Sequence, residues 1–180
     1  MSTRGLLIVK DNQGEVKVAE YISHDAYPSY AGSKLLQMCK RDGFIKSLSL
    51  SLKNVGFIND DEDKDPEVDK NEGIDILEFI INESNARDHT NLENSFNFGR
   101  DSLFCEWAYM IDLKENKFVV FQGFNKNFEN QDKMFEVEKE DIDPRFPYYG
   151  VTRLCEFDLN ALPLEGDFYS EIESKYDDLY

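Results

Sequence analysis

The residues best suited to chemistry lie at the open end of an expected N-terminal β-hairpin. Arg4 precedes its first strand, and His24 and Asp25 follow its second strand. An arginine guanidinium binds phosphate through two parallel hydrogen bonds, and a histidine beside a carboxylate transfers protons near neutral pH. These three side chains are therefore candidate catalytic residues for cleavage of RNA by its own 2′-hydroxyl group, a reaction that requires no metal ion.

Two lysines of the same hairpin extend this hypothesis toward RNA binding. Lys10 and Lys17 lie near the turn and, with Arg4, are the candidate phosphate contacts. The structural alternative is a loop histidine, an Asp25 that caps a turn, and an Arg4 in an ordinary surface ion pair. A second catalytic alternative is Ser2 as an N-terminal nucleophile, which ranks lower because it requires removal of Met1.

The cysteines and histidines do not have the spacing of a metal site. The chain has three cysteines and two histidines, and no CxxC or HExxH pattern occurs. Widely separated cysteines in an odd number are typical of a reducing compartment, where each is a small buried apolar residue. We expect neither a metal ion nor another cofactor.

The net charge of −17 is unevenly distributed along the 180 residues. Residues 1–59 contain eight basic and five acidic side chains, whereas residues 60–180 contain twelve and 32. One interpretation is a solvated acidic surface, and the other is an acidic face that docks on a basic partner such as a nucleic-acid-binding channel. The candidate partner-binding residues are Asp60, Asp61, Glu62, Asp63, Tyr176, Asp177 and Asp178.

Composition and patterning predict one α+β domain over residues 1–180. Apolar residues make up 41% and aromatic residues 13% of the chain, which excludes an acidic disordered tail. The apolar runs are too short to cross a membrane. Residues 1–22 predict a β-hairpin around the turn Asp11–Gly14, and the segment from Ser29 to Cys39 predicts a helix that ends at Gly43.

The rest of the chain predicts further helices and a mainly antiparallel sheet. Residues 44–58 fit both a strand and a helix, and we favour the helix. An acidic loop is expected at 60–73, a short helix at 74–83, and strands at 102–113, 118–124, 134–137 and 151–159. Residues 165–180 form an expected acidic tail, helical from Ser170. The aromatic side chains expected in the core are Trp107, Tyr109, Phe118, Phe121 and Phe124.

The N-terminal segment resembles a known protein family. Met1-Ser2-Thr3-Arg4-Gly5, the hairpin, His24-Asp25-Ala26-Tyr27-Pro28 and then Gly32 are similar to phage and bacterial proteins that open with M-x-T-R-[GS] and carry a D-[GA]-Y-P motif. The resemblance covers roughly the first 45 residues. Ala26 replaces the commoner glycine and His24 the commoner tryptophan, so a catalytic role of His24 need not be general in that family.

This opening, with the size and acidity of the chain, also resembles mobile-element counter-defence proteins, in particular anti-CRISPR proteins of type II. The resemblance implies an RNA-guided CRISPR nuclease and its guide RNA as partners, in the cytoplasm of a bacterial host. It implies guide-RNA truncation by the N-terminal hairpin, or, as the alternative, a non-enzymatic nucleic-acid mimic that blocks a basic channel. A binding module without any link to CRISPR is the third hypothesis.

Overall fold

The N-terminal hairpin forms as its turn residues predict. In the computed structural model, which describes residues 3–58, 66–83 and 86–177, strand β1 (Gly5–Lys10) pairs antiparallel with β2 (Val16–Ile22). The Asp11 carboxylate accepts hydrogen bonds from the backbone N–H groups of Gln13 and Glu15, at 2.9 and 3.0 Å. Gly14 has a φ of +89°, which glycine adopts without the steric cost of a side chain.

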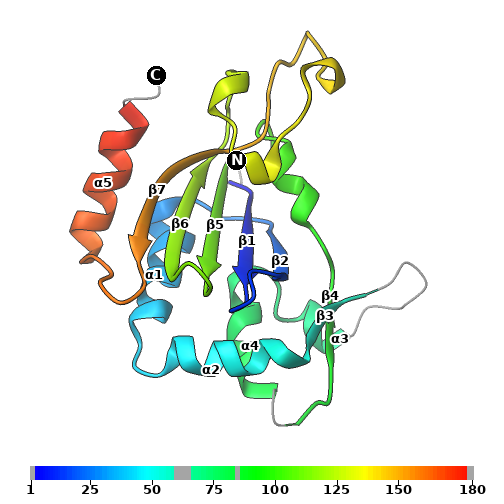
Figure 1. Ribbon diagram of the computed structural model, residues 1–180, viewed down its shortest axis with the longest axis vertical. Coiled ribbons are helices and arrows are strands. Elements are labelled where there is room, and N and C mark those ends of the chain that lie inside the picture. The colour runs from blue at the N-terminus through cyan, green and yellow to red at the C-terminus, as the bar shows by residue number, and fades with distance from the viewer. Residues whose placement is uncertain (1–2, 59–65, 84–85, 178–180) are drawn as a thin grey trace.

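A five-stranded sheet carries the hairpin at one edge, in the order β2-β1-β5-β6-β7 (Figure 1). Its other strands are β5 (Trp107–Asp112), β6 (Lys117–Gln122) and β7 (Thr152–Asp158). β1 and β5 run parallel, and the other neighbouring strands run antiparallel. A separate parallel pair joins β3 (Val55–Phe57) to β4 (Thr90–Leu92). The expected α+β class with a mainly antiparallel sheet is confirmed.

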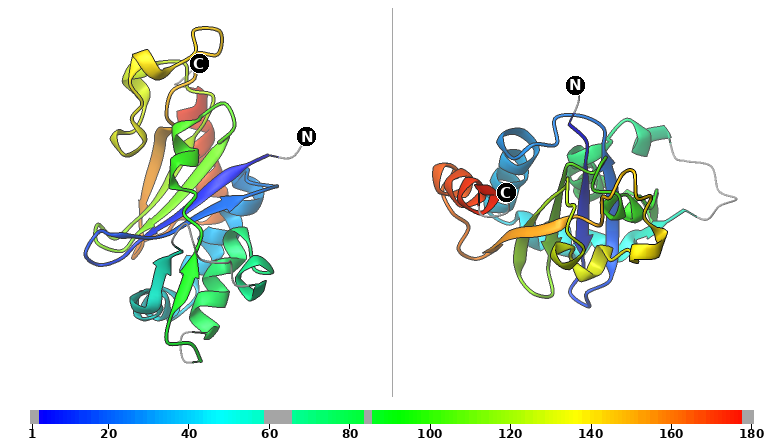
Figure 2. Two further views of the ribbon diagram at one scale, coloured as in Figure 1. Left: turned by 90° about the vertical axis from the view of Figure 1, so that its right-hand side faces the viewer. Right: turned by 90° about the horizontal axis from the view of Figure 1, so that it is seen from above.

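The two faces of the sheet are covered differently (Figure 2). Side chains alternate along β1, so Leu7 and Val9 face one core, whereas Leu6 and Ile8 face another. The first core lies under the longer helices, and the second lies under the irregular segments 96–100 and 133–135. The helices are α1 (Ser33–Lys40), α2 (Phe44–Ser51), α3 (Pro66–Asp69), α4 (Ile76–Glu83) and α5 (Glu165–Asp177).

Some expected boundaries are corrected. Residues 44–58 are helical only as far as α2 and one further turn, and then form β3. Within the acidic segment 60–73, the described part begins with α3 rather than a loop, and residues 59–65 lie outside the described residues. The C-terminal helix begins at Glu165 and not at Ser170.

The expected strand at 134–137 is wrong. Lys133–Phe135 forms a single 3₁₀ turn, because the Asp132 carboxylate accepts a hydrogen bond of 2.9 Å from the N–H of Met134. The side chain of Phe135 is buried, but it belongs to this turn and not to a strand with alternating side chains. The strand expected at 102–113 begins only at Trp107, because Cys105 N–H donates to the Asp101 carbonyl in a turn.

Most of the buried side chains are those expected. Tyr109, Phe118 and Phe121 are fully buried, and Trp107 is partly buried and packs against the core. Phe124 is 39% exposed and does not belong to the interior. All three cysteines are buried and free. Among the described residues, no helix is long and apolar enough to cross a bilayer, and no group of side chains has the arrangement of a metal site.

Candidate functional site

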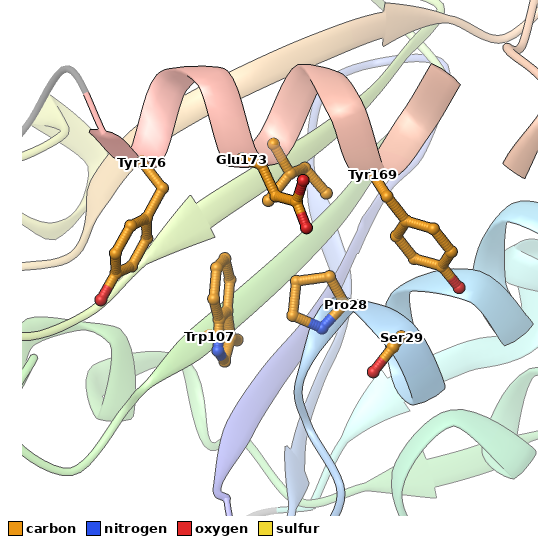
Figure 3. A pocket seen from close by; sticks show the side chains of 7 residues that line it. Pro28, Ser29, Trp107, Tyr169, Glu173 and Tyr176 are labelled. Carbon is orange, nitrogen blue, oxygen red and sulfur yellow. The ribbon is translucent and has the colours of Figure 1, made fainter. Parts of the chain in front are cut away.

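A hollow of about 500 Å³ opens between α5 and the segment that follows the hairpin (Figure 3). Trp107 and Tyr176 form one side of it, with ring centroids 6.5 Å apart and planes inclined by 25°. Glu173 points from α5 toward the opening. The seven lining residues are Pro28, Ser29, Trp107, Tyr169, Ile172, Glu173 and Tyr176, and none of them is a lysine or arginine. We call this site the aromatic hollow.

Helix α5 is held in place by both apolar and polar contacts. Phe168 is fully buried, with its ring centroid 6.1 Å from that of Phe118 in β6. At the start of α5 the Glu165 carboxylate accepts hydrogen bonds from the hydroxyl groups of Ser33 in α1 and Tyr169. These bonds lower the pKa of Glu165 below its ordinary value, because they stabilise the charged form. The wall of the aromatic hollow is therefore a fixed element.

The outer surface of α5 carries unpaired negative charge. Asp167, Glu171 and Glu173 are exposed, and none of them forms an ion pair with a residue that the structure describes. We call these three residues the α5 carboxylates. With 3.6 residues per turn, Asp167 and Glu171 lie on one side of the helix, and Glu173 lies on the side of the aromatic hollow, roughly 160° around the axis from Glu171. Tyr176, which the sequence predicted as a partner contact, is 41% exposed on the side of Glu173. The remaining predicted contacts, Asp60, Asp61, Glu62, Asp63 and Asp178, lie outside the described residues, and Asp177 is described only as the last residue of α5.

Sequence reasoning missed Trp107 and Glu173 as site residues. The spacing of Tyr169, Ile172 and Tyr176 places them on one side of a helix, which is a signal available from the sequence. The approach of Trp107 to that helix depends on the strand order, because β5 lies two strands away from β7 in the sheet. No local pattern indicates it.

Two segments that carry the family motif, Thr3–Gly5 and Asp25–Ala26, pack tightly against each other at the open end of the hairpin. The N–H of Ala26 donates to the carbonyl of Thr3 at 3.1 Å, and the Tyr109 hydroxyl donates to the carbonyl of Ala26 at 2.8 Å. A Cβ atom on Gly5 would lie 2.7 Å from the Cβ of Ala26. Asp25 has a φ of +53°, a conformation that aspartate tolerates better than most residues. The motif residues thus have a structural role in fixing the chain here.

The candidate catalytic residues are not brought together. The Arg4 guanidinium lies 4.6 Å from the ring centroid of Phe104. Gly5 faces Ala26, and successive residues of a strand face opposite sides of the sheet. Arg4 therefore lies on the side of the sheet away from α1. His24 instead lines a small hollow with Lys34 of α1 and Asp75. Arg4 and His24 therefore point away from opposite faces of the sheet.

His24 is exposed, and its imidazole is oriented by a serine. Its Nδ1 atom lies 2.8 Å from the Ser23 hydroxyl oxygen, and its Nε2 atom makes no hydrogen bond within the described part of the chain. Asp25 accepts a hydrogen bond of 3.2 Å from the Tyr27 hydroxyl, and no hydrogen bond joins it to His24 among the described residues. The negative charge of Asp25 raises the pKa of Tyr27. The expected histidine–carboxylate pair is thus absent from this arrangement.

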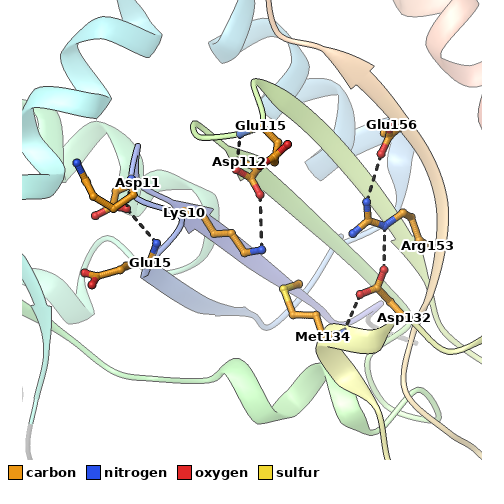
Figure 4. A network of polar contacts seen from close by, with 10 residues as sticks. Lys10, Asp11, Glu15, Asp112, Glu115, Asp132, Met134, Arg153 and Glu156 are labelled. Atoms are coloured by element: carbon orange, nitrogen blue, oxygen red, sulfur yellow. Dashed lines mark hydrogen bonds and ion pairs between the residues drawn. The ribbon is translucent and has the colours of Figure 1, made fainter.

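The two candidate RNA-binding lysines are both neutralised by carboxylates. The Lys10 ammonium lies 3.5 Å from Asp112, whose other hydrogen bond comes from the N–H of Glu115 (Figure 4). The Lys17 ammonium lies 3.4 Å from Glu15. Six residue steps along β1 separate Arg4 from Lys10 by about 20 Å. Arg4, Lys10 and Lys17 therefore do not form one phosphate-binding surface.

Three of the eight basic residues in the first third of the chain are paired with acidic residues from the remainder. Besides Lys10 with Asp112, Lys34 pairs with Asp75 at 2.5 Å and Arg41 pairs with Glu78 at 2.8 Å. In the folded chain these basic and acidic residues lie next to each other. The charge is therefore distributed more evenly in space than along the sequence.

A scan against protein-family models, a search of curated proteins and a search of solved structures each found no match. The function is accordingly inferred from the geometry and charge of the site itself. Its described part offers an exposed acidic helix beside an aromatic hollow, and an exposed histidine without a basic surface around it.

Proposed function

We propose that this chain is a non-enzymatic acidic binding protein that uses the α5 carboxylates to occupy a basic surface of a protein partner. The observation that carries the proposal is that Asp167, Glu171 and Glu173 are exposed on a helix anchored to the sheet and form no ion pair with a described residue. Carboxylates on a fixed helix can meet a basic surface without a large loss of conformational freedom on binding.

The charge balance of the whole molecule supports docking on a basic partner. At least nine of the 20 lysines and arginines are engaged in ion pairs within the chain, so the excess of negative charge faces outward. Opposite surface potentials accelerate association and select partners. The resemblance of the N-terminal segment makes an RNA-guided CRISPR nuclease the first partner to test, since such nucleases hold nucleic acid in a positively charged channel. The chain would then act in counter-defence by blocking that channel.

The test is the affinity for a nuclease–guide complex at increasing salt concentration. We expect binding that weakens steeply with salt, and a loss of about tenfold or more in affinity for the triple variant Asp167→Asn, Glu171→Gln and Glu173→Gln, since each exposed pair contributes up to about 1 kcal/mol. The readout is a binding isotherm together with inhibition of DNA cleavage.

A matched control removes the same net charge elsewhere. Glu129, Glu138 and Glu140 are exposed and form no ion pair with a described residue, so their conversion to glutamine changes the charge equally. We expect this variant to retain most of the affinity. Equal losses for the two variants would refute the assignment to α5, and no binding at any salt concentration would refute the nuclease as partner.

Guide-RNA truncation is the second candidate function, and the exposed His24 with its Nδ1 held by Ser23 favours it. It ranks second because the Arg4 guanidinium lies on the other side of the sheet and the nearby lysines are paired with carboxylates. Incubation of the chain with nuclease and guide RNA in the presence of a chelator, followed by a denaturing gel, tests it. His24→Ala should abolish truncation and His89→Ala should not; intact RNA at all times excludes this function.

A further inference from the structure

We infer that the aromatic hollow binds an arginine side chain of the protein partner. This inference rests on the proposed function and deepens it, because it names the group of the basic partner that α5 receives. The lining residues of the hollow include three aromatic side chains, one carboxylate and no cation, and two of the rings, Trp107 and Tyr176, are nearly parallel. A protein guanidinium is the group that such a combination recognises.

The size and the spacing of the rings fit a flat cation. A volume of about 500 Å³ lies within the range of ligand-binding sites and accommodates a single long side chain. A planar group in contact with two rings needs a separation of about 7 Å, since each contact takes about 3.5 Å. The ring centroids of Trp107 and Tyr176 are 6.5 Å apart. Tyr176 is 41% exposed, so a ligand can reach its ring from solvent.

The chemistry of the lining favours arginine over other ligands. The faces of tryptophan and tyrosine attract cations, tryptophan most strongly, and arginine stacks on them through its plane. Glu173 has no ion-pair or hydrogen-bond partner among the described residues, so its carboxylate is available for the paired N–H donors of a guanidinium. A phosphate or carboxylate ligand would meet Glu173 as a like charge.

The aromatic hollow is held in shape before any ligand arrives. Ile172 is 4% exposed and fixes α5 on the core, and the Tyr169 hydroxyl donates to Glu165 at 2.7 Å. On the opposite wall, Pro28 begins a helical turn with a restricted backbone. Side chains on such fixed elements lose little freedom on binding.

The chain offers a direct readout, because Trp107 is its only tryptophan. The experiment titrates the full chain with the peptide acetyl-Gly-Arg-Gly-amide and follows tryptophan fluorescence. We expect a saturable change in the millimolar range. The same peptide with lysine should bind more weakly, and the peptide with citrulline, which is nearly isosteric with arginine but neutral, should give no saturable change.

Two variants on α5 locate the effect. Glu173→Gln should weaken arginine-peptide binding by up to about fivefold, the upper end of the range for an exposed ion pair. Glu129→Gln, which removes the same charge outside the hollow, should leave the affinity unchanged. Tyr176→Ala removes a half-exposed ring and should abolish saturation. Equal binding of the lysine or citrulline peptide, equal effects of the two glutamine variants, or no saturation with the arginine peptide would each overturn the inference.

This test is independent of the test of the proposed function. The peptide needs no nuclease, so the aromatic hollow can fail while salt-dependent docking of α5 succeeds. Conversely, a chain that binds the arginine peptide but not the nuclease–guide complex retains the arginine site and loses the proposed partner.

Discussion

Replacement of Gly5 by alanine should destabilise the fold by a predictable amount. A Cβ atom at this position would lie 2.5 Å from the carbonyl oxygen of Trp107 and 2.7 Å from the Cβ of Ala26. Both distances are shorter than a van der Waals contact. The first contact is with backbone of the neighbouring parallel strand, which cannot turn away as a side chain would.

The magnitude follows from the cost of overpacking. Inserting one methyl group into a close-packed site costs about 1–3 kcal/mol. For a chain of this length each kcal/mol lowers the Tm by about 2–4 °C, so Gly5→Ala should lower it by roughly 2–12 °C. Since one of the two contacts is with Ala26, the double variant Gly5→Ala, Ala26→Gly should be more stable than the sum of the single changes, with a coupling of at least about 0.5 kcal/mol.

The assay is urea unfolding followed by circular dichroism and by the fluorescence of Trp107, whose carbonyl takes part in the clash. The control is Gly166→Ala in the first turn of α5, where no atom lies within 4 Å of the added Cβ. That change should stabilise the chain by about 0.4–1 kcal/mol. A Gly5→Ala variant within about 0.5 kcal/mol of the natural chain would refute the packing argument, because surface substitutions have effects of that size.

Three further predictions concern the interior and the base of α5. Tyr109→Phe removes the buried hydrogen bond to the Ala26 carbonyl and should lower the free energy of unfolding by about 1–2 kcal/mol, measured by urea unfolding. Ser33→Ala should destabilise most at neutral pH, and its effect should shrink as the pH falls through the pKa of Glu165, which lies below its ordinary value of 4.5; unfolding curves at neutral and acidic pH test this. The three thiols, Cys39, Cys105 and Cys155, are buried, and burial raises the pKa of each, to about 12 for Cys39 and Cys155. An aromatic disulfide reagent at neutral pH should therefore modify them far more slowly in the native chain than in the unfolded chain.

Elements defined by local chemistry could be predicted from the sequence. The turn Asp11–Gly14 carries an aspartate that accepts two backbone N–H groups and a glycine in a left-handed conformation, so the hairpin follows from four adjacent residues. The helix at 74–83 and the strand at 151–159 follow from the spacing of their apolar side chains. In each case the deciding interactions join residues close in sequence.

The rest depends on contacts between distant residues. Phe135 is buried from a single turn because Gly99 leaves space for its ring, so alternation around Met134 wrongly predicted a strand. Arg4 and His24 are close to the same hairpin end, yet the pleat of the sheet and the position of α1 send them to opposite sides. Trp107 meets α5 only through the strand order. These relations have no signature in the local pattern.

The division of charge along the chain shows how tertiary structure alters a conclusion drawn from composition. The parallel pairing of β1 with β5 places Asp112 opposite Lys10, and the packing of α4 against α2 brings Glu78 to Arg41. Three cations of the basic first third, Lys10, Lys34 and Arg41, are therefore paired with the acidic remainder. Helix α5 behaves differently because it packs on β7 at the edge of the sheet, and its carboxylates Asp167, Glu171 and Glu173 meet no described cation. Part of the negative charge that is left for a partner therefore lies on α5, with Glu173 at the aromatic hollow, and docking there should depend on α5 more than on the hairpin.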